Sequence, residues 1–279
     1  MKFHLLFLII ALIFLNISCS KEKEKISIVE KENLEMQMIK AYNDGVEQLN
    51  KGDAIYAAKK FNEAELLYPQ SIWAPRAALM ASYSYFSYLY YSDAVLELEK
   101  FLDKYKNHPR RDYAYYLLAL SHYDQIIDET KDLNEILKAK KYFEIIIQKY
   151  PETEFAIDSE YKLEFIQELL ASKEMYLARY YADREKWIPA INRFKTVVKK
   201  YETTIFVEEA LHRLVELHYK IGLTEESQKY AALLGYNYQS SKWYEETYRI
   251  LNKDYTKISK RKTNNKKESI LEKFKDLLK

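Results

Sequence analysis

The chain has 279 residues, of which only four are Gly and five are Pro. So few turn-forming residues exclude a β-sandwich or barrel of many short strands and favour long helices with short connections. The formal charge of +2 is uneven: residues 252–279 carry ten Lys and Arg against four Asp and Glu, a local +6, which leaves about −4 for the remainder. The body of the chain therefore lacks the basic surface that binds nucleic acid.

The N-terminus has the form of a targeting segment. Residues 1–18 are predicted to be a signal peptide, in which Lys2 supplies the charge, Phe3–Leu15 is a nearly continuous apolar run and Ser18 is the small residue before the cut. The run is too short to span a bilayer comfortably. The single cysteine of the chain, Cys19, follows directly, so no intrachain disulfide can form.

This junction resembles the lipobox of bacterial lipoproteins, which implies cleavage before Cys19 and attachment of lipid to it. The match is loose, because Leu15 lies four residues before the cysteine and Asn16 lies three before it, where leucine is commoner. An ordinary secretory signal followed by an unrelated cysteine is the alternative. Residues 19–32 include the run Lys-Glu-Lys-Glu-Lys and are expected to be a flexible, solvated tether behind the lipidated cysteine.

A pattern of four positions recurs five times in the body of the chain. A small residue is followed by apolar residues four and seven positions later and by a tyrosine eleven positions later, and these offsets share one face of an α-helix. The copies start 37, 45, 51 and 37 residues apart, which indicates stacked helix pairs. The small residues are Ala57, Ala94, Ala139, Ala190 and Ser227, and the tyrosines are Tyr68, Tyr105, Tyr150, Tyr201 and Tyr238.

The offsets resemble those of the tetratricopeptide repeat, whose period is about 34 residues. The resemblance implies an all-α fold, a right-handed superhelical solenoid of about five tetratricopeptide-like helix pairs. We assign residues 33–251 to the solenoid, with repeats one to three in 33–150, and repeats four and five with a capping helix in 151–251. Residues 252–279 are predicted to be a basic tail in which Ser269–Leu278 forms a short amphipathic helix.

Catalytic and metal-binding patterns are missing from the sequence. The histidines are His4, His108, His122, His212 and His218, and no two of them have the His-x-x-x-His spacing of a metal site. His122 and His218 fall inside amphipathic helices and are expected to be packed structural residues. Since the sequence also lacks a Gly-rich phosphate loop and a Gly-x-Ser-x-Gly elbow, we expect no catalytic residue, no metal and no cofactor, and hence no enzyme.

Three stretches go beyond a generic repeat. They are Tyr68–Ala77, His108–Leu117 and Tyr180–Phe194, and the last combines Tyr-Tyr, Trp and Asn-Arg-Phe. Together they resemble the BamD (ComL) family, the lipoproteins of the outer-membrane β-barrel assembly machine. The resemblance covers about residues 41–251, most of the chain after the signal peptide.

The resemblance implies a protein at the periplasmic face of the outer membrane, anchored in the lipid bilayer through Cys19. It further implies two protein partners, namely unfolded outer-membrane proteins held by the N-terminal repeats and the barrel-forming, BamA-like subunit, whose periplasmic domains bind the C-terminal repeats. The pattern departs from the family where Pro109 comes late in repeat two and where Glu202 replaces the usual proline in repeat four. The basic tail has no counterpart in this pattern.

The first helices of solenoid repeats line a concave groove. In repeats two and three this places aromatic residues and one arginine where an extended peptide rich in alternating aromatic residues would bind. The alternative is that several of these rings only pack between helices. The candidate substrate residues are Trp73, Arg76, Tyr83, Tyr113 and Tyr116.

The candidate residues for docking to the barrel-forming subunit are Arg184, Asn192 and Arg193. Arg193 lies three residues after Ala190, the small residue of the fourth repeat, yet its own helix offers no acidic residue at the spacings that form ion pairs. One alternative is that Arg193 pairs with a carboxylate of the same chain, with Asp183 or Glu185 as candidates. The other is that it pairs with an acidic residue of the partner, through the bidentate pairing that arginine favours.

Two other functions remain open. A repeat-containing lipoprotein could instead organise cell-wall or division proteins without touching barrel substrates. A transglycosylase with a helical superstructure would need a catalytic domain, and no residues are left over to build one.

Overall fold

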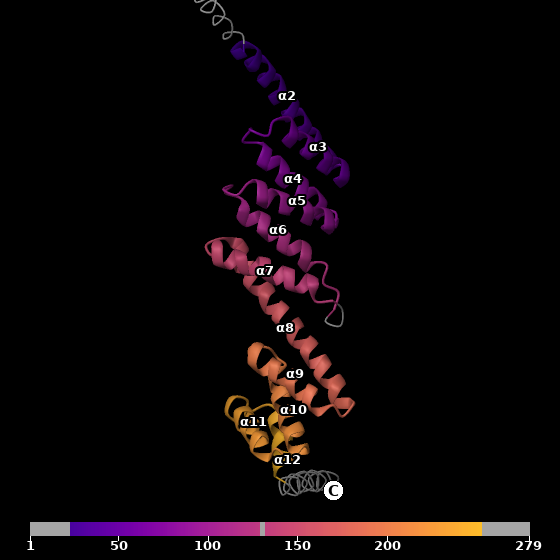
Figure 1. Cartoon of the computed structure of the whole chain (residues 1–279), viewed down its shortest axis with the longest axis vertical. Coiled ribbons are helices and arrows are strands. Elements are labelled where there is room, and N and C mark those ends of the chain that lie inside the picture. The colour runs from indigo at the N-terminus through magenta and orange to yellow at the C-terminus, as the bar shows by residue number, and fades with distance from the viewer. Residues whose placement is uncertain (1–22, 129–131, 253–279) are drawn as a thin grey trace, which may run out of the picture. The chain divides into compact units, whose positions relative to one another are not determined.

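The computed structural model describes residues 23–128 and 132–252 (Figure 1). Within these ranges every regular element is an α-helix, and none is long and apolar enough to cross a membrane. The helices are α2 (Lys23–Asn50), α3 (Ala54–Leu67), α4 (Ala74–Ser87), α5 (Tyr91–Lys104), α6 (Arg111–Tyr123), α7 (Asn134–Lys149), α8 (Glu154–Asp183), α9 (Trp187–Lys200), α10 (Val207–Lys220), α11 (Thr224–Asn237) and α12 (Lys242–Leu251).

The chain divides into two compact units between Gln125 and Ile126, each of which is built from consecutively packed helices. In the first unit α2 packs on α3, α3 on α4, α4 on α5 and α5 on α6, and α4 also contacts α6. In the second unit the order is α7, α8, α9, α10 and α11, with α12 packed on both α10 and α11. The predicted all-α fold of tetratricopeptide-like helix pairs is confirmed, whereas its right-handed superhelical path stays a prediction.

The seam positions, by which we mean the small and apolar residues of the repeat pattern where neighbouring helices meet, are buried as the spacing predicts. All five small residues that begin the repeats have no exposed surface, as do Phe61, Leu98, Phe143 and Phe194 four positions later. In the first repeat the two helices approach closely at Gly45 of α2, where an added Cβ would lie 2.9 Å from the Phe61 ring. A small residue on one helix therefore accommodates a large ring from its neighbour, which is how these pairs reach the packing density of a protein core.

Each repeat's second helix ends at the recurring tyrosine, with or without a proline after it. The backbone N–H groups of Tyr105, Tyr150, Tyr201 and Tyr238 donate to the carbonyl four residues earlier, and their carbonyls then accept a turn N–H from three residues later. The hydroxyl of Thr204 also donates to the Tyr201 carbonyl, at 2.7 Å. These bonds satisfy the end of the helix, so Glu202 in the place of proline leaves the termination unchanged.

The turn inside four helix pairs uses one left-handed residue. Gly52 and Gly222 hold φ of 88° and 83°, while Leu89 and Glu185 hold 66° and 58° at the equivalent positions. In all four turns the next residue donates its N–H to the carbonyl five residues earlier, over 2.8–3.0 Å. This is the Schellman arrangement, for which glycine is the usual residue because a Cβ is disfavoured there.

The remaining predictions concern the two ends of the chain and one histidine. Helix α2 begins at Lys23, so it includes part of the stretch 19–32 that we expected to be a tether. Residues 1–22 and 253–279 lie outside the described part of the chain, so the signal peptide, the lipid on Cys19 and the helix at Ser269–Leu278 stay predictions. His218 is a packed residue as expected, because it is buried and its Nδ1 lies 2.7 Å from the Leu214 carbonyl.

Candidate functional site

The first group of candidate substrate residues surrounds Trp73, just before α4. The Trp73 ring meets the Tyr42 ring of α2 edge-on, with centroids 5.4 Å apart. The guanidinium carbon of Arg76 lies 5.0 Å from the Trp73 ring centre and 5.8 Å from that of Tyr42, within reach of cation–π attraction. Trp73 also packs on the apolar core of the first unit, so the packing alternative holds in part for this ring. Tyr42 also belongs to this group. The sequence did not predict it, because it lies on the preceding repeat.

The second group joins α4 and α6. The Tyr83 side chain remains 38% exposed, and the partly buried Tyr113 lies near it. Burial, and next the neighbouring Tyr83, raise the pKa of Tyr113 to about 12, so its hydroxyl stays protonated at neutral pH. Tyr116 follows Tyr113 by about one turn of α6 and is also partly buried.

The two groups share one face of the first unit. Arg76 and Tyr83 are seven residues apart on α4, which places them on the same side of that helix about 10 Å apart along its axis. Tyr83 in turn is close to Tyr113 of α6, a helix that contacts α4. The resulting surface, which we call the aromatic face, has the exposed Arg76 at one end and tyrosine hydroxyls at the other, where the exposed Arg110 also lies near Tyr113.

The candidate docking residues lie in the second unit, and Arg193 has an intrachain partner. Nη1 of Arg193 lies 3.0 Å from each carboxylate oxygen of Glu174, on α8. The expected intrachain partners, Asp183 and Glu185, were wrong: the carboxylate comes from nineteen residues earlier, across the seam between α8 and α9. Local spacing could not have identified it. The Arg193 side chain is still 42% exposed, against 16% for Glu174.

The other two docking candidates point to solvent. Asn192 is exposed, and Arg184 is exposed at the end of α8, with its guanidinium carbon 3.6 Å from the centre of the Tyr180 ring. Nη1 of Arg184 also donates to the Tyr180 carbonyl at 3.3 Å. Stacking on the ring holds the cation in one place while its remaining N–H groups stay available for a carboxylate.

A pocket of about 350 Å³ between α8 and α10 lies beside these residues. Its floor includes Trp187, over whose ring Nζ of Lys220 lies at 4.1 Å. Arg179 on its wall is held by Glu209 through two bonds of 3.0 and 2.6 Å. Arg213 lines the pocket as well and is paired with Glu216 at 2.6 Å, so both arginines of this pocket are neutralised, while Lys220 is exposed.

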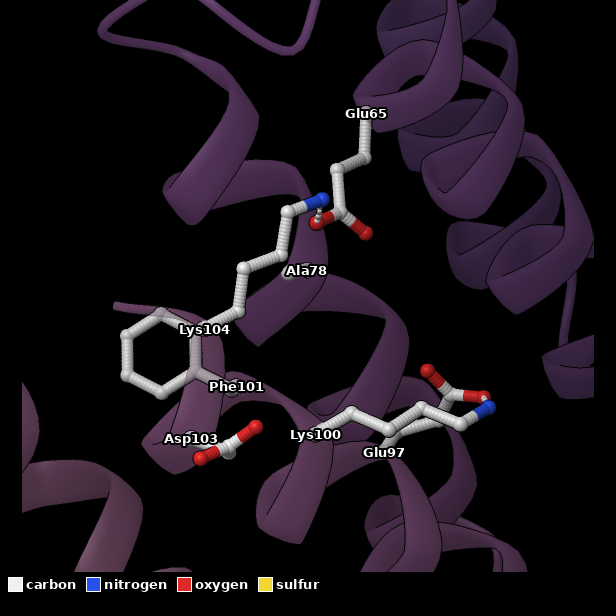
Figure 2. Close-up of a pocket in the computed structure, with 7 residues that line it drawn as sticks. All are labelled: Glu65, Ala78, Glu97, Lys100, Phe101, Asp103 and Lys104. Atoms are coloured by element: carbon white, nitrogen blue, oxygen red, sulfur yellow. Dashed lines mark hydrogen bonds and ion pairs between the residues drawn. The ribbon is translucent and has the colours of Figure 1, made fainter. Parts of the chain in front are cut away.

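Figure 2 shows a second pocket, of about 420 Å³, in the first unit. Lys104 of α5 points to Glu65 of α3, with Nζ 2.7 Å from Oε1, and Lys100 points to Glu97 on its own helix, at 2.9 Å. The Tyr105 hydroxyl also donates to Glu65, at 2.5 Å. Burial and this carboxylate raise the pKa of Tyr105. The two lysines and two glutamates of this pocket pair with one another, and Asp103 pairs with Lys106 at 3.7 Å, so the pocket indicates a link between α3 and α5 rather than a ligand site.

Metal chemistry has no support in the structure as described, because residues 23–128 and 132–252 contain no group of His, Cys, Asp and Glu side chains arranged to hold a metal ion. Neither pocket contains a candidate nucleophile beside a base.

Residues 34–234 match the family model YfiO, described as an outer membrane lipoprotein. The outer membrane protein assembly factor BamD of Rickettsia prowazekii is 40% identical over 210 residues, covering 75% of this chain and 84% of that protein. BamD of Caulobacter vibrioides is 36% identical over 211 residues, covering 76% and 69%.

Solved structures give a weaker match. The structure of PilF from Pseudomonas aeruginosa has a TM-score of 0.34 and 13% identity, covering 82% of this chain and 90% of that one. A tetratricopeptide-repeat protein from Thermus thermophilus has a TM-score of 0.33 and 16% identity, covering 77% and 98%. The helix order described above and the sequence matches carry the assignment instead: the chain belongs to the BamD family of outer membrane lipoproteins, which are assembly factors and not enzymes.

Proposed function

We propose that this protein is a scaffold of the outer-membrane β-barrel assembly machine, with its two units serving two partners. The first unit holds unfolded barrel substrates, and the second docks to the periplasmic domains of the barrel-forming subunit. Membership of the BamD family supports the assembly role. The observation that carries the proposal is the aromatic face, which combines the exposed ring of Tyr83 and partly buried neighbouring rings with an exposed arginine on a surface built from α4 and α6.

The chemistry of that face suits an unfolded outer-membrane strand. Strands of such barrels alternate apolar and polar residues and carry aromatic girdles. Tyr83 offers a partly exposed ring to such side chains, and the protonated Tyr113 hydroxyl is a hydrogen-bond donor. Arg76, held over the Trp73 ring, can take a carboxylate at the end of the substrate chain. Binding of this kind needs no fixed sequence beyond aromatic residues and a terminal charge.

The second unit offers the docking surface. Arg193 is tied to Glu174 but keeps two fifths of its side chain in solvent, and Asn192 and Arg184 are exposed. An acidic residue of the partner can therefore reach Arg193 from the open side, or replace Glu174. Burial of the arginine under a partner would strengthen this charge pair by removing water around it.

Lipid at Cys19 completes the proposal, since it would anchor the protein at the periplasmic face of the outer membrane. Lipoproteins of this type carry more than one acyl chain, which gives stable attachment, whereas one chain binds only marginally. The cysteine lies four residues before the start of α2. The first unit would then be held close to the membrane.

Co-purification from solubilised outer membranes tests this function against its alternative. We expect the full-length protein to recover a large β-barrel protein with periplasmic domains, together with unfolded barrel substrates. Recovery of only wall-remodelling or division proteins would support the alternative, a lipoprotein scaffold for that machinery, and would overturn the proposal.

A further inference from the structure

Helix α8 carries an exposed apolar stripe near its N-terminal end. Ile157, Tyr161 and Phe165 follow one another at intervals of four residues, so they lie on one face of the helix. Their exposed fractions are 59%, 68% and 51%. Ala156 and Ile166, on the other side of the same helix, are buried in the second unit. A row of large apolar side chains on a solvated helix face is typical of an interaction site.

Acidic residues surround this stripe. Between Glu154 and Phe165 the sequence has four carboxylates, those of Glu154, Asp158, Glu160 and Glu164, and one lysine, so the net charge is −3. Lys162 lies 3.3 Å from Asp158, and Glu160 and Glu164 are exposed. The partner that fits is therefore an apolar surface with basic residues around it.

The same chain contains a segment of that chemistry, outside the described residues. Its last eleven residues place apolar side chains at the spacing of one helical face, and the 28 residues from Asn252 onward have ten Lys and Arg against four Asp and Glu. A helix repeats its i, i+4 neighbours about every 6 Å, so the stripe and such a segment would match in period. The apolar residues of the segment are Ile270, Leu271, Phe274, Leu277 and Leu278.

The tail is long enough to reach the stripe within one molecule. The sixteen residues 253–268 can span about 50 Å when extended, and their seven Lys and Arg repel one another and favour extension. Three successive packings, α12 on α10, α10 on α9 and α9 on α8, separate the end of α12 from α8. Each step is about 8–10 Å, and the stripe lies about 27–39 Å along α8 from Asp183, so the tail reaches the stripe when it is nearly fully extended.

We propose that the segment Ser269–Leu278 docks on the α8 stripe of its own molecule. Its apolar face covers Ile157, Tyr161 and Phe165, and its lysines, with those of the preceding linker, lie against Glu160 and Glu164. The basic tail is then an intramolecular cover for an apolar surface.

Photo-crosslinking in the full chain tests this contact. p-Benzoylphenylalanine replaces Tyr161, the protein is irradiated at about 0.1 M and about 1 M salt, and cross-linked peptides are located by mass spectrometry. The matched control carries the same probe at Tyr236, which is 86% exposed on α11. Because α11 packs on α12, from which the tail leaves, this control measures chance encounters with the tail.

We expect cross-links from position 161 to residues 269–279 of the same chain, at least about tenfold above those from position 236. Phe274→Asp should abolish them and high salt should reduce them, whereas Thr263→Asp, the same charge change in the linker, should leave most of them. Equal yields at the two positions, cross-links that persist in Phe274→Asp, or products with the mass of two chains would overturn the proposal.

Discussion

Both carboxylate oxygens of Glu174 lie 3.0 Å from a single nitrogen, Nη1 of Arg193, and this ion pair joins α8 to α9. Tyr201, at the end of α9, lies close to the same carboxylate: burial first, and Glu174 second, raise the pKa of its hydroxyl. The docking candidate is thus part of the internal structure of its unit and at the same time partly exposed. A substitution at this residue has to be tested for both roles.

Arg193→Ala should lower affinity for the barrel-forming subunit at least about tenfold, because removing one member of a buried interfacial pair costs about 2–5 kcal/mol. The monomer should lose no more than about 1 kcal/mol of stability, since the pair with Glu174 is partly exposed and screened. Binding is measured by calorimetry with the soluble periplasmic domains, and stability by urea unfolding.

Two variants separate the roles of Arg193. Glu174→Gln removes the internal partner but keeps the arginine, so affinity should be retained. Arg249→Ala, an exposed arginine on α12 that is also paired with a glutamate, should change neither quantity. If Arg193→Ala destabilises the monomer while each folded molecule binds as before, Arg193 belongs to the fold and not to the interface.

The sequence was most informative about which residues of each helix are buried, and least informative about side-chain contacts between helices. Ala57, Phe61 and their counterparts were located by spacing, because one face of a helix must be buried at a fixed period. The Glu174–Arg193 pair and the stacking of Tyr42 on Trp73 were not, since they depend on how neighbouring helices lie against each other. The left-handed turn at Leu89 was not predicted for a different reason. Glycine is the residue that indicates a positive φ in a sequence, and this turn has leucine there.

Leu89→Gly should stabilise the first unit. A left-handed residue with a Cβ costs about 1–2 kcal/mol, and the extra chain entropy of glycine in the unfolded state returns about 0.5–1 kcal/mol of this, so the net gain is about 0.5–1 kcal/mol. Leu96→Gly is the matched control, because Leu96 is an exposed residue inside α5, where glycine should cost about 1 kcal/mol. Urea unfolding that ranks the two variants equally would contradict the assignment of strain to Leu89.

Ala139→Leu should destabilise the second unit by about 1–3 kcal/mol, because Ala139 has no exposed surface and the added side chain would overpack the seam of α7. Damage should extend to the packed neighbour α8, which hydrogen exchange can show. Ala232→Leu, on the exposed side of α11, is the control and should be nearly neutral. An unchanged melting temperature in Ala139→Leu would place residue 139 outside the seam.

His212 makes the attachment of the capping helix sensitive to pH. Its Nδ1 lies 2.8 Å from the Thr247 hydroxyl of α12, and Nε2 lies 3.6 Å from Glu216 and 3.8 Å from Glu246. Burial lowers the pKa of His212 more than Glu216, Glu246 and Glu209 raise it, and Arg213 lowers it further. The folded state therefore binds a proton less readily than the unfolded chain, whose histidine has a pKa of about 6.5.

Stability from this group should accordingly be complete above pH of about 6.5 and decline as the pH falls below that value. His212→Gln should flatten the decline in melting temperature measured between neutral and mildly acidic pH. Part of the decline in melting temperature should remain in this variant, because burial also lowers the pKa of His108 in the first unit. An identical pH profile for the variant and the parent protein would show that His212 does not set this dependence.

Capture of unfolded substrate on the aromatic face is tested most directly by fluorescence anisotropy of a labelled peptide that ends in alternating aromatic residues, titrated with the full-length protein. Tyr113→Ala and Arg76→Ala should each weaken binding about tenfold, as expected for residues at the centre of an interface. Tyr236→Ala, in the second unit, should have no effect. Equal binding of a scrambled peptide, or unchanged affinity in both aromatic-face variants, would contradict the proposal that this surface recognises barrel substrates.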